Sequence, residues 1–287
     1  MARVFNKRTR FLTLERRWGN EGGHGPNPCG GRGGDGESGP VAAIAEGAMV
    51  GCDVVVLPEC LDLGWTHPSV FTQAETIPGP RSDRICQAAA EHRVFVVAGL
   101  TERRGDEIYN TAILVDSSGN LVATHRKINI LDIAANLYSP GETLHVSETP
   151  WGVVGVLICA DNFPEKTALG EALYHMGARA ILSPCAWAVP PDFNQEKTPY
   201  GDLWRGSYCS LTRDRDLTVI GVSNVGPVSG GPWEGHHCIG NSMAIGTNGK
   251  EIAVLPFGHS AECIRIITCP MGSPRGAQKA RRFTKIN

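Results

Sequence analysis

Short apolar runs alternate with helical patterns from residue 40 to residue 255, and this alternation limits the possible folds more than any other feature. The runs "DVVVLPE" (53–59), "RVFVVAGL" (93–100) and "VVGVLIC" (153–159) are nearly continuous in apolar residues. Strands of this kind have to be covered, and the helices between them can cover at least one face of a sheet. The alternation therefore predicts an α/β fold.

Two hairpins modify this prediction. Residues 109–127 form two strand patterns around the turn sequence Ser-Ser-Gly-Asn, and residues 242–255 form a second pair. Because tight turns join antiparallel strands, the sheets are predicted to be mixed rather than purely parallel. The remaining elements are predicted as helices over 41–51, 82–92, 165–177 and 201–216, and as strands over 179–189 and 217–226.

The two ends of the chain differ from its centre. Ten glycines lie between Gly19 and Gly39, so residues 1–39 are expected to form an irregular segment, in which "RFLTL" (10–14) is the only candidate strand. The last residues, 272–287, are basic and polar and are predicted to be a solvated tail or a subunit-contacting arm. A single domain is therefore expected over residues 40–271.

Charge and hydropathy exclude several classes of partner. The formal net charge of −2 at pH 7 gives no reason to expect nucleic acid or an anionic membrane. No apolar run approaches the roughly 18 residues of a membrane helix, and the N-terminus lacks the apolar stretch of a secretory signal. We therefore expect a cytoplasmic protein with no membrane partner.

The ten cysteines do not form a metal or disulfide pattern. There is no C-x-x-C pair, and most of the cysteines stand in apolar segments, where Cys behaves as a small hydrophobe. One alternative is a zinc-binding protein that uses His236, His237 and Cys238, but no second ligand pair stands at zinc spacing. No metal or other cofactor is predicted.

Three polar residues stand where strands are predicted to end. Glu59 follows "VVVLP", Lys127 closes "LVATHRK" and Cys159 closes "VVGVLIC". Reactive groups gather at such positions in α/β sheets. Together the three supply a thiol nucleophile, a carboxylate base to take its proton, and an ammonium to stabilise an oxyanion.

The stretches around these residues resemble the nitrilase superfamily of carbon–nitrogen hydrolases. The three motifs stand as "GCDVVVLPECLDLGW", "THRKINI" and "GVLICADNFPE", and the similarity extends from about Pro40 to Pro270, including "IPGP" and the hairpin "IGNSMAIGTNGKEIA". The resemblance implies a four-layer αββα sandwich with mixed β-sheets. It also implies that Glu59 is the general base, Lys127 the oxyanion stabiliser and Cys159 the nucleophile that forms a thioester.

The function implied is hydrolysis of a non-peptide C–N bond in a small amide or N-carbamoyl compound, with nitriles as weaker candidates. The resemblance also implies a homodimer or larger homo-oligomer without a cofactor. Three residues are candidates for substrate binding: Ala160, whose backbone N–H follows the nucleophile, Asp161 and Trp187.

The sequence departs from the family pattern in three places. Ala134, Ala135 and Asn136 stand where a second Glu is common, and the segment from Cys159 to Phe-Pro-Glu is one residue shorter than usual. The Gly-rich segment also replaces most of the usual first helix. These departures keep open a different function, that of a catalytically impaired family member acting as a binding or assembly protein.

Overall fold

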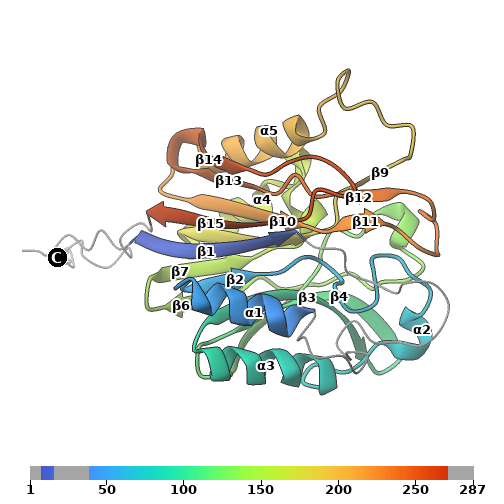
Figure 1. Cartoon of the computed structure of the whole chain (residues 1–287), viewed down its shortest axis with the longest axis horizontal. Coiled ribbons are helices and arrows are strands. Elements are labelled where there is room, and N and C mark those ends of the chain that lie inside the picture. The colour runs from blue at the N-terminus through green and yellow to red at the C-terminus, as the bar shows by residue number, and fades with distance from the viewer. Residues whose placement is uncertain (1–7, 16–38, 271–287) are drawn as a thin grey trace, which may run out of the picture.

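The structure is a computed structural model that describes residues 8–15 and 39–270. Two six-stranded mixed sheets pack face to face, and helices cover their outer faces, which confirms the predicted four-layer αββα arrangement (Figure 1). The first sheet has the order β15-β1-β2-β3-β4-β5 and the second has the order β14-β13-β10-β8-β7-β6. A small third sheet, β11-β12-β9, continues from the ends of strands in the second sheet.

The first sheet comprises β1 (Arg8–Glu15), β2 (Val54–Val56), β3 (Phe95–Arg104), β4 (Glu107–Val115), β5 (Leu121–Arg126) and β15 (Cys263–Pro270). The second comprises β6 (Val146–Thr149), β7 (Gly152–Val156), β8 (Ala180–Cys185), β10 (Thr218–Ser223), β13 (Met243–Gly246) and β14 (Lys250–Val254). The third comprises β9 (Ala188–Val189), β11 (Val225–Pro227) and β12 (His237–Ile239).

The helices are α1 (Pro40–Met49), α2 (Val70–Gln73), α3 (Pro80–His92), α4 (Ala168–His175) and α5 (Gly201–Thr212). Four short 3-10 turns are η1 (Asp132–Ala134), η2 (Cys159–Asn162), η3 (Pro164–Lys166) and η4 (Thr247–Gly249). Helices α1 and α3 pack on the first sheet and share an apolar cluster with β2 and β3. Helix α4 lies against β7 and β8 in the second sheet, and α5 contacts β10 and β13. None of the helices in the described part of the chain is long and apolar enough to cross a bilayer.

Two of the strands predicted from sequence are each divided in the structure. The run 179–189 forms β8 and then β9, and the run 217–226 forms β10 and then β11. The division follows the last in-register pair of β8 and β10, Cys185 with Ser223. Beyond this pair both segments leave the second sheet and continue as β9 and β11, which pair with β12 instead. An apolar run shows that a strand is buried, but it does not show where the strand changes sheets.

Strand β1 includes the candidate strand over 10–14. It pairs antiparallel with β15 along its whole length and parallel with β2 at three positions, among them Phe11 with Val54. Phe11 is fully buried between the sheets, where its ring meets Trp151 edge-on at 5.6 Å. β1 therefore separates β2 from β15 and contributes a large apolar side chain to the central core.

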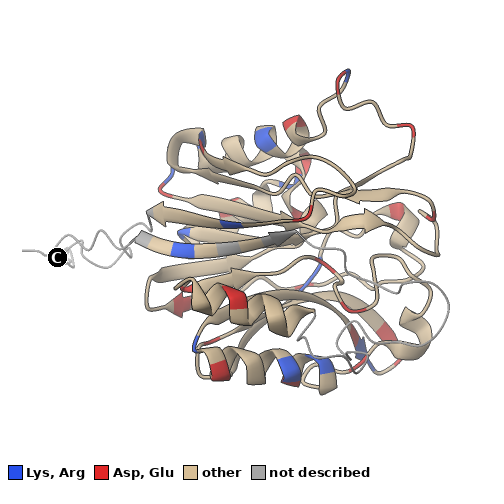
Figure 2. Ribbon diagram, viewed as in Figure 1, with Lys and Arg blue, Asp and Glu red and all other residues tan. Residues whose placement is uncertain are grey.

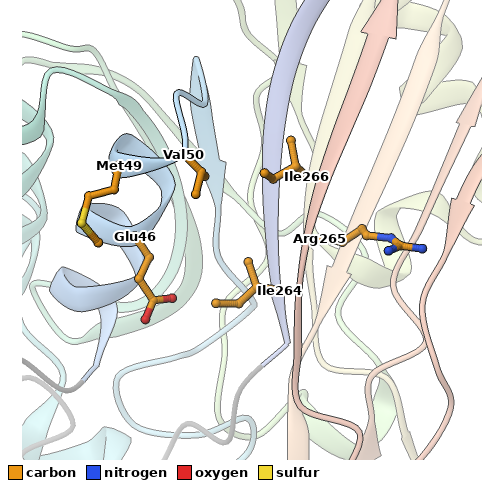
Figure 3. Close-up of a pocket in the computed structure, with 6 residues that line it drawn as sticks. All are labelled: Glu46, Met49, Val50, Ile264, Arg265 and Ile266. Carbon is orange, nitrogen blue, oxygen red and sulfur yellow. The ribbon is translucent and has the colours of Figure 1, made fainter.

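The surface carries a groove whose lining includes none of the predicted reactive residues. It has a volume of about 460 Å³ and lies between the end of α1 and β15 (Figure 3). The groove is lined by Glu46, Met49, Val50, Ile264, Arg265 and Ile266. Elsewhere on the fold, cationic and anionic residues are interspersed along the ribbon rather than separated by sign (Figure 2).

We expect the variant Phe11→Ala to lower the free energy of unfolding by about 3–5 kcal/mol, because the substitution opens a cavity between the sheets. Urea unfolding followed by tryptophan fluorescence would measure the change. Phe71→Ala is the matched control: Phe71 is 54% exposed, so its loss should cost less than about 0.5 kcal/mol. Equal effects of the two variants would contradict the central position of β1.

Candidate active site

The three predicted reactive residues follow strands of both large sheets. Glu59 comes three residues after β2 and Lys127 directly after β5, both in the first sheet. Cys159 comes three residues after β7, in the second sheet. The backbone N–H of Glu59 donates to the carbonyl of Cys185 across the two sheets at 3.2 Å. The face-to-face packing of the sheets therefore brings these strand ends to one place.

Glu59 and Lys127 form a buried ion pair. Lys127 Nζ lies 2.6 Å from Glu59 Oε1, and both side chains are almost completely excluded from solvent. Burial acts against the ammonium, but the charge of Glu59 and the hydrogen bond to it outweigh burial and raise the pKa of Lys127 above its usual range. Lys127 is therefore a permanent cation in this site.

The second oxygen of Glu59 is available for proton transfer. Asn110 Nδ2 also donates to Oε1 at 2.6 Å, so the two fixed donors share one carboxylate oxygen. Oε2 is buried and has no hydrogen-bond partner among the described residues. A buried acceptor without a donor is costly unless a proton or a ligand reaches it, and it is the arrangement expected of a general base.

The backbone holds Glu59 in place. The amide of Asn224 donates to the Glu59 carbonyl at 2.8 Å. Gly99 lies directly beneath the turn, and a Cβ at this position would come within 2.5 Å of Glu59 Cα. Only glycine allows the two backbones to approach so closely, so β3 supports the base without a side chain between them.

Cys159 occupies a strained turn at the exit of its strand. It is the first residue of η2, is 7% exposed and has a φ of 42°, a value that non-glycine residues rarely adopt. Burial, a hydrogen bond with Cys185 and the charge of Glu59 raise the pKa of the Cys159 thiol well above its usual range, whereas Lys127 acts to lower it. These surroundings favour the neutral thiol of Cys159 over the thiolate.

The structure places the predicted substrate-binding residues in fully or almost fully buried positions. Ala160 follows Cys159 in η2, and its carbonyl accepts the N–H of Phe163 at 3.2 Å. Asp161 is completely buried, and both of its carboxylate oxygens accept hydrogen bonds from protein groups. Trp187 is also fully buried and stacks on Trp204 at 4.8 Å.

Several residues of the site were not singled out by sequence. Asn110 and His125 are polar residues in the strand patterns of β4 and β5, and their outward or inward direction depends on register. Burial, and after it the neighbouring Cys159 and Cys185, raise the pKa of the Tyr200 and Tyr208 phenols, so both tyrosines border these thiols. A polar residue inside an otherwise apolar strand, as in "IYNTA", is the signal that could have identified Asn110.

The position of the missing second carboxylate is apolar. Ala134 is buried in a cluster with Cys60, Trp65 and Tyr138, whereas the flanking carboxylates Asp132 and Glu142 are exposed. Lys127 Nζ lies 6.0 Å from the centroid of the Trp65 ring, so this cluster borders the ion pair. Glu59 is thus the carboxylate that is paired with Lys127, and among the described residues the cluster around Ala134 contributes no second carboxylate.

The candidate zinc ligands have other contacts. His236 stacks on Trp233 at 4.7 Å, His237 lies beside the ring of His259 at 5.2 Å, and Cys238 is buried. Within residues 8–15 and 39–270 no group of three or more His, Cys, Asp or Glu side chains is arranged to hold a metal ion.

Comparison with known proteins gives one consistent family. Residues 41–273 match the carbon-nitrogen hydrolase family. Omega-amidase NIT2 of Xenopus tropicalis is 34% identical over 155 residues, which are 50% of this chain and 55% of that protein. Bifunctional nitrilase/nitrile hydratase NIT4A of Nicotiana tabacum is 30% identical over 164 residues, 50% of this chain and 46% of that protein. The chain thus spans about half the length of the curated relatives it matches.

Solved structures show the same fold. An amidase from Nesterenkonia sp. superposes with a TM-score of 0.72 and 18% sequence identity, covering 93% of this chain and 92% of that one. The two-sheet sandwich described above is therefore an established fold rather than a new arrangement.

We expect Lys127→Met to lower the free energy of unfolding by about 3–5 kcal/mol, since it leaves the Glu59 charge buried without a partner. The double variant Glu59→Gln/Lys127→Met should recover much of this loss, because neither charge then has to be buried. Thermal unfolding of the two single variants and the double variant would measure the coupling. If the losses in the free energy of unfolding of the two single variants add up to that of the double variant, the two side chains are not coupled as a buried ion pair.

Proposed function

The chain belongs to the carbon-nitrogen hydrolase family, and we propose that it hydrolyses the C–N bond of a small amide or N-carbamoyl compound through a thioester on Cys159. The observation that carries this proposal is the buried pair of Glu59 and Lys127, with its free carboxylate oxygen, next to a buried thiol. The proposed roles are general base for Glu59, oxyanion stabiliser for Lys127 and nucleophile for Cys159.

In the first half of the reaction, Glu59 Oε2 takes the proton of the Cys159 thiol and the sulfur attacks the amide carbon. The tetrahedral oxyanion receives hydrogen bonds from Lys127 Nζ and from the backbone N–H of Ala160. Glu59 then passes the proton to the departing nitrogen. The C–N bond breaks, ammonia or an amine leaves, and the acyl group remains on sulfur as a thioester.

In the second half, Glu59 takes a proton from water and the resulting hydroxide attacks the thioester carbon. Collapse of the intermediate releases the acid, and the proton returns to the sulfur of Cys159. Because Ala134 stands in an apolar cluster, we assign water activation to Glu59 alone. The net reaction consumes one amide and one water and releases one acid and one amine or ammonia.

The proposed substrate class is a small amide, with nitriles as a weaker second candidate. The omega-amidase relative supports amides, and the nitrilase relative keeps nitriles in consideration. A non-catalytic binding or assembly role has less support, because all three groups of the reaction are buried in the site and Glu59 keeps an unpartnered oxygen.

We further propose a homodimer or larger homo-oligomer in the cytoplasm. Leu203 on α5 and Met176 just beyond α4 are large apolar side chains that are 44% and 48% exposed, and they would be covered by a second subunit. Eight of the cysteines that the structure describes, among them Cys86, Cys159 and Cys185, are free thiols, as in proteins of a reducing compartment.

We expect Cys159→Ala to lower kcat by roughly 10³-fold or more on a panel of small amides and N-carbamoyl compounds, because the nucleophile is lost. Intact mass spectrometry of the unsubstituted protein with the same panel should show an acyl adduct, and peptide mapping should place it on Cys159. Cys86→Ala, which changes a half-buried thiol of α3, is the control and should keep full turnover. Wild-type turnover in Cys159→Ala would refute the mechanism.

A further inference from the structure

Asp161 is a buried carboxylate whose contacts reach both halves of the site. Its Oδ1 accepts the backbone N–H of Ile128 at 3.1 Å and that of Asn129 at 2.8 Å. Its Oδ2 accepts the Nε2–H of His125 at 2.8 Å and the backbone N–H of Ile158 at 3.1 Å. The side chain is completely excluded from solvent.

These contacts keep Asp161 ionised. Burial alone would raise the pKa of the carboxyl, but the hydrogen bond from His125 and those from the backbone outweigh it and hold the pKa below its ordinary range. Asn129 Nδ2 is a fifth donor, at 3.3 Å from Oδ1. A carboxylate with five donors has no lone pair directed toward a substrate. Asp161 is therefore poorly suited to the substrate-binding role expected from sequence.

The positions of the donors show what the carboxylate connects. His125, Ile128 and Asn129 stand on either side of Lys127, at the end of β5 in the first sheet. Ile158 directly precedes Cys159, at the end of β7 in the second sheet. One side chain therefore joins the segment that carries the ammonium to the turn that carries the thiol.

We propose that Asp161 is a positioning residue that holds the Lys127 ammonium at a fixed place relative to the Cys159 thiol. This inference rests on the proposed function, since the spacing of the two groups matters only if Lys127 stabilises charge that develops at the carbon attacked by sulfur. Asp161 touches neither the substrate nor the transferred atoms. It acts through the two segments that it joins.

Two other roles for Asp161 predict different results. As a purely structural residue it would affect stability without changing the reactivity of Cys159. As a simple negative charge it would disfavour the thiolate, so its removal would lower the pKa of the thiol. As a positioning residue it keeps the thiolate-stabilising Lys127 in place, so its removal would raise the pKa of the thiol. The sign of the change distinguishes the three roles.

The test compares Asp161→Asn with Glu102→Gln. Glu102 is a second buried carboxylate near Lys127: it accepts Arg126 Nε at 2.8 Å and Thr111 Oγ1 at 2.7 Å, and none of its hydrogen bonds reaches the turn of Cys159. Both substitutions replace a buried, hydrogen-bonded carboxylate with an amide of the same shape. They therefore match in stability cost and differ in their link to the nucleophile.

Two measurements are made on each variant. The first is the rate of Cys159 alkylation by iodoacetamide as a function of pH, followed at the Cys159 peptide by mass spectrometry. The second is kcat and KM on the best amide of the panel, well below the unfolding temperature of each variant. The ionisable groups that surround the thiol are the same in both variants: Glu59, Lys127, Cys185, Tyr200 and Tyr208.

For Asp161→Asn we expect a higher pH midpoint of alkylation and a loss of kcat of roughly 100-fold, with KM within about threefold, as for a misplacement of about 1 Å. Glu102→Gln should keep the midpoint and should lose less than about threefold in kcat, since its loss disturbs Arg126 and Thr111 but not the turn of Cys159. A lowered or unchanged midpoint in Asp161→Asn, or equal kcat losses in the two variants, would overturn the proposal.

The experiment also tests the proposal in two less favourable cases. If the unsubstituted protein turns over no amide, the proposed function fails, while the alkylation midpoint still tests the positioning role. If Asp161→Asn does not fold, His125→Phe removes one of the five hydrogen bonds to Asp161 and should lower kcat about tenfold with KM nearly unchanged. An unchanged kcat in His125→Phe would then overturn the proposal.

Discussion

The ion pair between Lys127 and Glu59 is the interaction on which the rest of this structure depends. Two opposite charges held 2.6 Å apart in the interior are tolerated only because each neutralises the other and because further donors satisfy the carboxylate. Both residues follow strands of the first sheet, and the backbone N–H of Glu59 donates to the Cys185 carbonyl of the second sheet, so the pair lies where the two sheets meet. The packing of the two sheets and the electrostatics of the site therefore depend on each other.

The thiol is held in a different way from the charges. Its turn is strained, with a positive φ at Cys159, and hydrogen bonds on both sides of Cys159 balance the strain. The backbone N–H of Ile158 donates to Asp161 Oδ2, and Asn162 Nδ2 donates to Ser183 Oγ. Ser207 on α5 adds a further bond to the Asn162 carbonyl. Helix α5 of the outer layer thus helps to fix the turn that begins at Cys159, although none of its side chains has a role in the proposed chemistry.

The sequence was sufficient to predict an α/β fold, mixed sheets and the three strand ends, because each of these depends on local apolar patterns and on the order of residues. The four-layer sandwich was predicted from the resemblance to the family and not from these patterns. The sequence was not sufficient for β6 and β12, which have only a few residues each, or for β15, which pairs with β1 at the other end of the chain. From sequence, Asn110 and His125 were expected to be structural residues, and their hydrogen-bond partners could not be predicted. A strand pattern shows that such side chains are near the core, but only the register with neighbouring strands shows which carboxylate each one meets.

The segment between β9 and α5 has a consequence for how substrate range could change. Residues 190–200 are mostly exposed, and Phe193 in this segment is half-buried between Tyr200 and Phe257. Glu59, Lys127 and Cys159, by contrast, stand at strand ends of the two sheets, where backbone hydrogen bonds hold the turns around them. Under the function proposed above, the fold separates these three residues from an exposed segment whose length and sequence can change without disturbing them.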